Sequence, residues 1–116
     1  MPKDDIREIY EGRQYQGTEE ELAYRLDTAN WSTTPTSPAT PSAVSVAIYS
    51  VVDTTGTVVY TDTTVTNLSG AASVSGQYIT TPAVIDLVVG TLYRIEIKFT
   101  LETNIWEAYA YIQGER

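Results

Sequence analysis

The stretch Leu87-Val88-Val89-Gly90-Thr91-Leu92-Tyr93-Arg94-Ile95-Glu96-Ile97 decides the fold of this 116-residue chain. From Tyr93 onward, every second side chain is apolar, and the apolar set is Tyr93, Ile95, Ile97, Phe99 and Leu101. The side chains between them are Arg94, Glu96, Lys98 and Thr100. Because side chains of a strand point alternately to its two faces, this period of two predicts a strand with one buried and one solvated face.

The residues just before this strand resemble the tyrosine corner of immunoglobulin-like (Ig-like) and fibronectin type III domains. Leu87 and a turn at Gly90 precede Tyr93 at the matching spacing. In those domains the tyrosine hydroxyl bonds to backbone a few residues upstream and fixes the turn between two sheets. The resemblance implies an Ig-like sandwich, the alternative being a strand with an incidental tyrosine. The motif indicates the fold and says nothing about function.

A tight turn at Thr103-Asn104 predicts a hairpin with a second strand. Its expected inward side chains are Trp106, Ala108, Ala110 and Ile112, and its outward ones are Ile105, Glu107, Tyr109 and Tyr111. The outward set is unusually apolar for a solvated face. Either flanking loops or the N-terminal strand cover it, or it is a surface for a partner, since tyrosine is enriched at interfaces.

The remaining chain also has the pattern of an all-β domain. Leu22, Tyr24 and Leu26 alternate with polar neighbours, and a proline-rich stretch at residues 32–42 predicts an extended crossing between sheets. Further strands at roughly 8–12-residue spacing follow from residue 43, separated by Gly and Asp/Asn turns. We therefore predict an all-β, Ig-like β-sandwich of about seven antiparallel strands at residues 18–116, with an N-terminal extension.

Residues 1–17 are mixed and polar, and we expect them to form an N-terminal arm. Ile6, Ile9 and Tyr10 are spaced like one face of a short helix, but a helix below about 12 residues is marginal without docking. The arm is therefore either a frayed terminus or a strap that docks on a neighbouring subunit through these three residues.

Composition argues against several functions. The chain has no histidine and no cysteine, which removes Ser-His-Asp and Cys-His catalysis, disulfides and His- or thiolate-bound zinc. The acidic residues fall mostly at turns or wet strand faces, and Asp53, Asp62 and Asp86 lack the spacing of a calcium loop. We expect no enzymatic activity, catalytic residue, cofactor, metal or small-molecule substrate.

The charge pattern and the ends of the chain bear on partners and location. The net charge is −8 and the basic residues are scattered, which argues against nucleic acid as a partner. No run approaches the roughly 18 apolar residues of a membrane span, and the N-terminus lacks the apolar stretch of a signal peptide. We expect a soluble protein that is not bound to a membrane.

One resemblance reaches beyond the generic fold. The segments EEELAYRLDTANW, VSVAIYSVVD, GQYITTPAV, LVVGTLYRIEIKFT and NIWEAYAYIQGER follow one another in this order. This arrangement resembles the small Ig-like proteins of tailed-phage and prophage structural gene clusters, over residues 19–115. The resemblance implies a subunit of the virion, at the neck, the head–tail joint, the tail or the capsid surface, and it brings no catalytic residues.

The predicted function is that of a non-enzymatic structural subunit of a phage or prophage virion, assembled in the host cytoplasm. Its expected partners are other virion subunits and further copies of itself, and its candidate interface is Ile6, Ile9, Tyr10, Ile105, Tyr109 and Tyr111. One alternative is an Ig-like binding module for carbohydrate or a cell surface, in which Tyr15, Tyr49 or Tyr60 would form an aromatic platform. Another is an accessory domain of an enzyme with no activity of its own.

Overall fold

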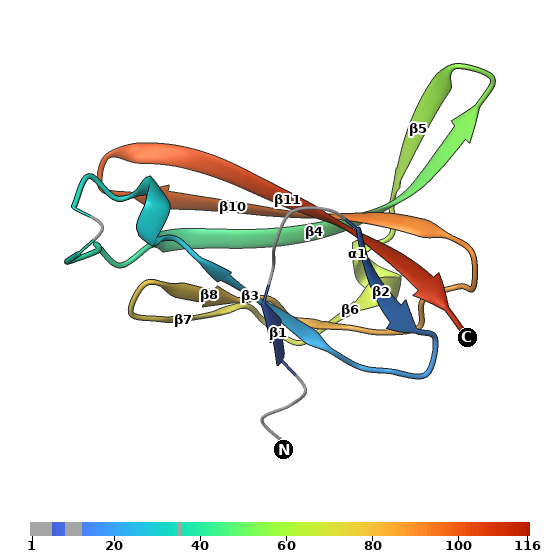
Figure 1. The fold of residues 1–116 in the computed structure, drawn as a ribbon, viewed down its shortest axis with the longest axis horizontal. Coiled ribbons are helices and arrows are strands. Elements are labelled where there is room, and N and C mark those ends of the chain that lie inside the picture. The colour runs from blue at the N-terminus through green and yellow to red at the C-terminus, as the bar shows by residue number, and fades with distance from the viewer. Residues whose placement is uncertain (1–5, 9–12, 35) are drawn as a thin grey trace.

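The computed structural model describes residues 6–8, 13–34 and 36–116, and of residues 6–8 only the backbone. This part of the chain is mostly β-strand, which confirms the predicted all-β class (Figure 1). The helical elements here are a 3-10 turn at Ala29–Trp31 and α1 (Thr64–Asn67). The strands are β1 (Ile6–Glu8), β2 (Arg13–Gly17), β3 (Ala23–Asp27), β4 (Ser42–Thr54), β5 (Thr57–Asp62), β6 (Leu68–Ser69), β7 (Ser73–Ser75), β8 (Tyr78–Thr80), β9 (Ala83–Val84), β10 (Leu92–Leu101) and β11 (Asn104–Glu115).

Two sheets face each other across a shared core (Figure 1). The larger sheet has the strand order β2-β11-β10-β4-β5, and the smaller has the order β1-β3-β8-β7. Strands β6 and β9 form a separate two-stranded sheet. The core side chains come from both layers, for example Leu26 of β3 and Ile79 of β8 against Ile97 and Phe99 of β10. The arrangement is that of a β-sandwich.

The alternation read from the sequence is confirmed in β10 and β3. Tyr93, Ile95, Ile97, Phe99 and Leu101 are all buried, whereas the intervening side chains of β10 are partly or fully exposed. In β3 and just before it, Leu22, Tyr24 and Leu26 are buried. The inward side of β11 agrees at Ala110 and Ile112. Trp106 lies directly across from Phe99 but remains partly exposed.

The polar, proline-containing segment between β3 and β4 links the two sheets, as predicted. Strand β3 belongs to the smaller sheet and β4 to the larger one. Trp31 packs edge-to-face on Phe99, with 5.7 Å between ring centroids. The carboxylate of Glu102 accepts a hydrogen bond of 2.8 Å from the Thr33 hydroxyl. These contacts hold the start of the link against the β10–β11 turn.

The structure differs from the predicted arm at residues 1–17. Strand β2 pairs in parallel with β11, and β1 pairs in parallel with β3. Residues 13–17 are therefore part of the larger sheet rather than an extension of it. Gln14 and Gln16 of β2 are buried, and the Gln16 side chain donates to the Val84 carbonyl at 2.8 Å. Polar side chains at the inward positions hide this strand from a search for apolar alternation.

The strand count and direction also differ from the prediction of about seven antiparallel strands. The described residues contain eleven strands, several of only two or three residues. Two of the pairings are parallel, both made by strands near the N-terminus. Parallel pairing needs a crossover instead of a hairpin, so it joins segments far apart in sequence that local patterns do not reveal.

Candidate functional site

The outward face of the larger sheet gathers side chains from all five of its strands. Antiparallel pairing places directly opposed residues on the same face. Arg94 of β10 is opposite Tyr111 of β11 on one side and Tyr49 of β4 on the other. The row continues to Arg13 of β2 and Asp62 of β5. Tyr109 and Tyr60 lie in the adjacent rows, so we call the group Tyr49, Tyr60, Tyr109, Tyr111 and Arg94 the tyrosine face.

Arg94 is the centre of the tyrosine face. Its guanidinium carbon lies 3.9 Å from the ring centroid of Tyr109, 5.5 Å from that of Tyr60 and 6.0 Å from that of Tyr111. Tyr109 and Tyr111 meet edge-to-face at 5.8 Å. A cation over an aromatic ring is attracted by the negative face of the π-system. The stacking therefore orders long side chains that would otherwise be free to move on the surface.

Polar contacts complete the cluster. The Arg94 guanidinium donates to the Tyr111 hydroxyl at 3.4 Å and forms an ion pair of 2.8 Å with Glu96. Partial burial alone would lower the pKa of Arg94, but the hydrogen bond with Tyr111 and the charge of Glu96 outweigh it and raise the pKa. The guanidinium is therefore a cation at neutral pH.

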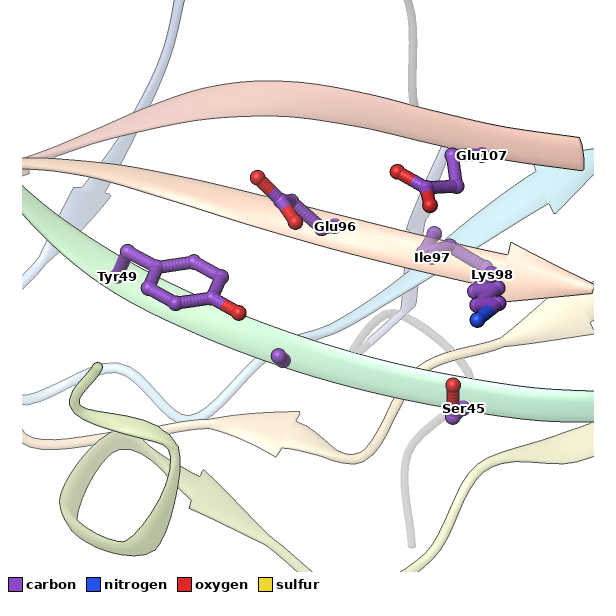
Figure 2. Close-up of a pocket in the computed structure, with 7 residues that line it drawn as sticks. Ser45, Tyr49, Glu96, Ile97, Lys98 and Glu107 are labelled. Carbon is purple, nitrogen blue, oxygen red and sulfur yellow. The ribbon is translucent and has the colours of Figure 1, made fainter. Parts of the chain in front are cut away.

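Tyr49 lies beside an open depression on the same face (Figure 2). Partial burial raises the pKa of Tyr49, and the carboxylates of Glu96, Asp62 and Glu107 raise it further. The hydroxyl is therefore a protonated hydrogen-bond donor at neutral pH. The depression has a volume of about 220 Å³ and is lined by Ser45, Ala47, Tyr49, Glu96, Ile97, Lys98 and Glu107.

The groups around the depression are suited to binding. In Figure 2 the side chains of Glu96 and Glu107 extend from neighbouring strands, and Lys98 lies across from Ser45. A carboxylate accepts hydrogen bonds, whereas the Lys98 ammonium and the Tyr49 hydroxyl donate them. A shallow, mixed surface of this kind can match polar groups of a partner around an aromatic centre.

Three residues of the predicted interface lie on this face. Ile105, Tyr109 and Tyr111 all point outward from β11, and the exposed fractions of Ile105 and Tyr109 are 66% and 55%. Strand β2 extends the sheet at the edge of β11 and does not cover the face. Among the described residues, Ile105 and Tyr109 therefore remain exposed on the outward side of β11.

Of the other three predicted interface residues, the structure describes only Ile6, and only by its backbone. Ile6 lies in β1, at the edge of the smaller sheet. Ile9 and Tyr10 lie outside the described residues. The use of these three residues as an interface therefore stays a prediction.

The residues of the predicted tyrosine corner, Leu87, Gly90 and Tyr93, lie at the turn that precedes β10. The Val88 N–H donates to the Tyr93 hydroxyl at 3.0 Å, so the ring spans the turn that precedes β10. Leu87 is buried beside Tyr93 in the core, and Gly90 has a φ of 80°. Only glycine adopts this left-handed backbone without strain, which explains its position in the turn.

Sequence reasoning missed the association of Tyr49 and Tyr60 with the hairpin tyrosines, and the central place of Arg94. It treated Tyr49 and Tyr60 as a separate platform and Arg94 as one residue of a wet strand face. The parity of each strand was a usable signal, since Tyr49 is on the opposite face from the apolar Ile48. The register that aligns the strands was not available from the pattern.

Comparison of the chain with protein-family models, curated proteins and solved structures gives no match. Among the residues that the structure describes, no helix is long and apolar enough to cross a membrane. Within the same residues, no group of three or more acidic side chains is arranged to hold a metal ion. The candidate site is thus defined by its own geometry, as an aromatic and charged surface on a sheet.

Proposed function

We propose that this protein is a non-enzymatic structural subunit of a phage or prophage virion, with an Ig-like sandwich that works through protein–protein contacts. The observation that carries the proposal is the exposed cluster of Arg94 with Tyr60, Tyr109 and Tyr111. Tyrosine and arginine are the residues most enriched at the energetic centres of protein interfaces. The resemblance over residues 19–115 supplies the particular setting, a virion.

The physical properties of the cluster support this use. Tyr109 and Tyr111 lie on β11, which pairs along its length with β10, and their rings contact each other and Arg94, so little side-chain freedom remains to be lost on binding. The Arg94 charge is already balanced by Glu96 at 2.8 Å, so a partner need not supply an ion to bury it. The tyrosine corner at Tyr93 supports the Ig-like part of the proposal, because it is a hallmark of that sandwich.

The test uses particles made by cells that carry the gene. We expect mass spectrometry of purified particles to find the chain in fixed ratio to other structural proteins. Tyr109→Ala should lower its incorporation by about tenfold or more, since a central interface aromatic contributes at least about 1.4 kcal/mol. Thr100→Ala, an outward position of β10 distant from Arg94 in the register, is the matched control and should be incorporated normally. Intact particles without the chain would contradict the proposal.

A glycan-binding module is the second candidate function, and the same surface favours it. Exposed tyrosine rings beside the carboxylates of Glu96 and Glu107 offer an apolar platform with hydrogen-bond acceptors at its edge. However, the guanidinium of Arg94 already occupies one face of Tyr109 at 3.9 Å, which leaves Tyr60 as the better stacking surface. A glycan array on which the full chain binds nothing would count against this candidate.

A further inference from the structure

The hairpin of β4 and β5 projects away from the body of the molecule (Figure 1). Its two-residue turn, Thr55-Gly56, has φ values of 49° and 83°. Positive φ at both central residues defines a type I′ turn, whose twist matches that of paired strands. The hairpin is therefore a regular ladder up to its tip and presents an ordered strand at the edge of the larger sheet.

This projecting hairpin is apolar on both faces. Every residue of β5 is exposed, and the exposed fractions of Val58, Val59 and Tyr60 are each 47%. Val58 and Tyr60 point to the side of the tyrosine face. Val59 points to the other side, opposite Val52, which is 51% exposed. Valine suits a pleated surface that is at least half buried, so this pattern favours a partner on the hairpin.

The outer edge of β5 has main-chain groups aimed away from β4. The type I′ turn makes Thr54 and Thr57 a hydrogen-bonded pair, and such pairs then recur at every second residue. The Thr63 N–H donates to the Ile48 carbonyl at 2.9 Å, which fits this phase. The N–H and C=O groups of Val58 and Tyr60 therefore point outward. Because β5 is the last strand of its sheet, no strand of the described chain pairs with them.

The edge also lacks the usual protection against pairing. Exposed edge strands normally carry a lysine, a proline or a bulge, or are very short. Residues 57–61 contain no charge and no proline, and the β4–β5 register is continuous. The other sheet edges differ, since β2 begins with Arg13 and β1 and β7 have three residues each. Of the described edges, β5 is the one suited to accept another strand.

We propose that β5 pairs with β5 of a second copy of this chain, antiparallel and about a twofold axis near Tyr60. An isologous contact requires a self-complementary edge, and antiparallel pairing of β5 with itself is one. This arrangement sets Asp62 opposite Val58 of the other copy instead of opposite a second carboxylate. Because Asp62 is the one charge of β5 and faces Val58, two chains of net charge −8 can meet here without direct like-charge pairing. For an edge strand of a different protein, the structure offers no matching feature of this kind.

The contact would join the two larger sheets into one continuous sheet and bring the two tyrosine faces side by side. Pairing by strand addition obtains affinity from main-chain hydrogen bonds and specificity from alternate side chains. A second copy of the chain is one of the partners expected under the proposed function, and pairing through β5 does not involve the stacking around Arg94.

The experiment is sedimentation equilibrium of the full chain over a range of concentrations, with two variants at one position. Val58→Pro removes an outward N–H without removing a β4–β5 hydrogen bond, and edge strands tolerate proline there. Val58→Thr keeps the N–H and a branched side chain and is the matched control. We expect the native chain and Val58→Thr to dimerise, and Val58→Pro to do so at least about tenfold more weakly. A native chain that remains a monomer up to about millimolar concentration, the weak end of specific association, overturns the inference.

Two further measurements locate the contact, and the first needs no variant. In the native chain, amide exchange at Val58 and Tyr60 should slow as concentration rises, because dimer formation would occupy these N–H groups. Unchanged exchange at concentrations where the chain is dimeric places the contact elsewhere and overturns the inference. Tyr109→Ala should leave the dimer intact. Loss of the dimer with Tyr109→Ala but not with Val58→Pro would support the tyrosine face as the contact and overturn the pairing of β5.

Discussion

At the scale of single residues, Tyr93 links the turn before β10 to the core. Its ring is buried among the side chains of both sheets, and its hydroxyl accepts the Val88 N–H. The same turn is held from the other side by main-chain bonds, from the Gly90 N–H to the Gly114 carbonyl at 2.9 Å and from the Gly114 N–H to the Thr91 carbonyl at 3.0 Å. The tyrosine and the end of β11 thus fix one short turn together.

Replacing Tyr93 with phenylalanine isolates the contribution of the hydroxyl. We expect Tyr93→Phe to lower the free energy of unfolding by about 1–2 kcal/mol, because the Val88 N–H loses the partner that it has at a partly buried position. Urea unfolding followed by fluorescence measures the change. Tyr111→Phe is the control, since its hydroxyl bond to Arg94 is long and near the surface, and it should cost less. An unchanged midpoint for Tyr93→Phe would show that the corner does not stabilise the fold.

A buried network at residue scale explains part of what sequence reasoning missed. The Tyr24 hydroxyl donates to the Gln16 side-chain oxygen at 2.8 Å, while the Gln16 amide donates to the carbonyls of Val84 and Glu20. Burial of a glutamine is tolerated only when its polar groups are satisfied, and here the partners come from the turn and strand that follow β2 and from Val84, which is 68 residues away. The pattern of β2 alone therefore predicts an exposed arm, although the residue is fully buried.

At the scale of elements, β11 passes unusually close to the loop before β10. A Cβ atom added at Gly114 would lie 2.3 Å from the Val88 carbonyl oxygen, a backbone atom that cannot rotate away. The close approach is what allows β11 to form main-chain bonds with the loop and, one residue later, with the turn after β2, where the Thr18 N–H donates to the Glu115 carbonyl. Gly114 is thus a packing requirement at the meeting point of β2, β11 and the loop.

Substitution at Gly114 tests this close contact. We expect Gly114→Ala to destabilise the protein by about 1–3 kcal/mol, because the backbone of the loop or of β11 must shift to admit the methyl group. Gly17→Ala is the matched control at the end of β2, since its new Cβ would meet mainly the flexible Glu20 side chain, at 3.2 Å. Thermal unfolding of both variants gives the comparison. Equal stability of the two variants would show that the Gly114 backbone moves without cost.

The elements that the sequence predicted well are those whose pattern is local. Strand β10 alternates without a break, and its buried side chains agree with the prediction at each position. Strands β1 and β2 were not foreseen as part of the sheets because their partners, β3 and β11, come later in the chain and pair in parallel. Parallel pairing leaves no hairpin turn in the sequence, so such strands can be assigned only once the tertiary arrangement is known.

At the scale of the whole molecule, the tyrosine face depends on the register of several strands. Local pattern placed Tyr109 and Tyr111 on the outward side of the hairpin, and the structure agrees. Tyr49 and Tyr60 join them because β4 lies between β10 and β5, an order that crosses the sequence. The sequence therefore indicated the individual tyrosines of the site. Their grouping around Arg94 could be recognised only from the strand order of the larger sheet.

The charge of the whole molecule predicts how self-association responds to salt. Each chain has 15 acidic and 7 basic residues, so two copies repel at long range, whereas the proposed β5 contact has Asp62 as its one charged residue, opposite Val58 of the other copy. The Debye length falls from about 30 Å at about 0.01 M salt to about 8 Å at about 0.15 M, so added NaCl screens the repulsion but leaves main-chain hydrogen bonds in place. We expect the dimer dissociation constant, measured by sedimentation equilibrium, to fall several-fold over this range. Val58→Pro, as the control, should show little change in mass. A dimer that weakens as salt is added would instead indicate a contact between opposite charges. The β5 edge contains no such pair. That outcome would point to a contact through Arg94 and Lys98, on the tyrosine side of the sheet.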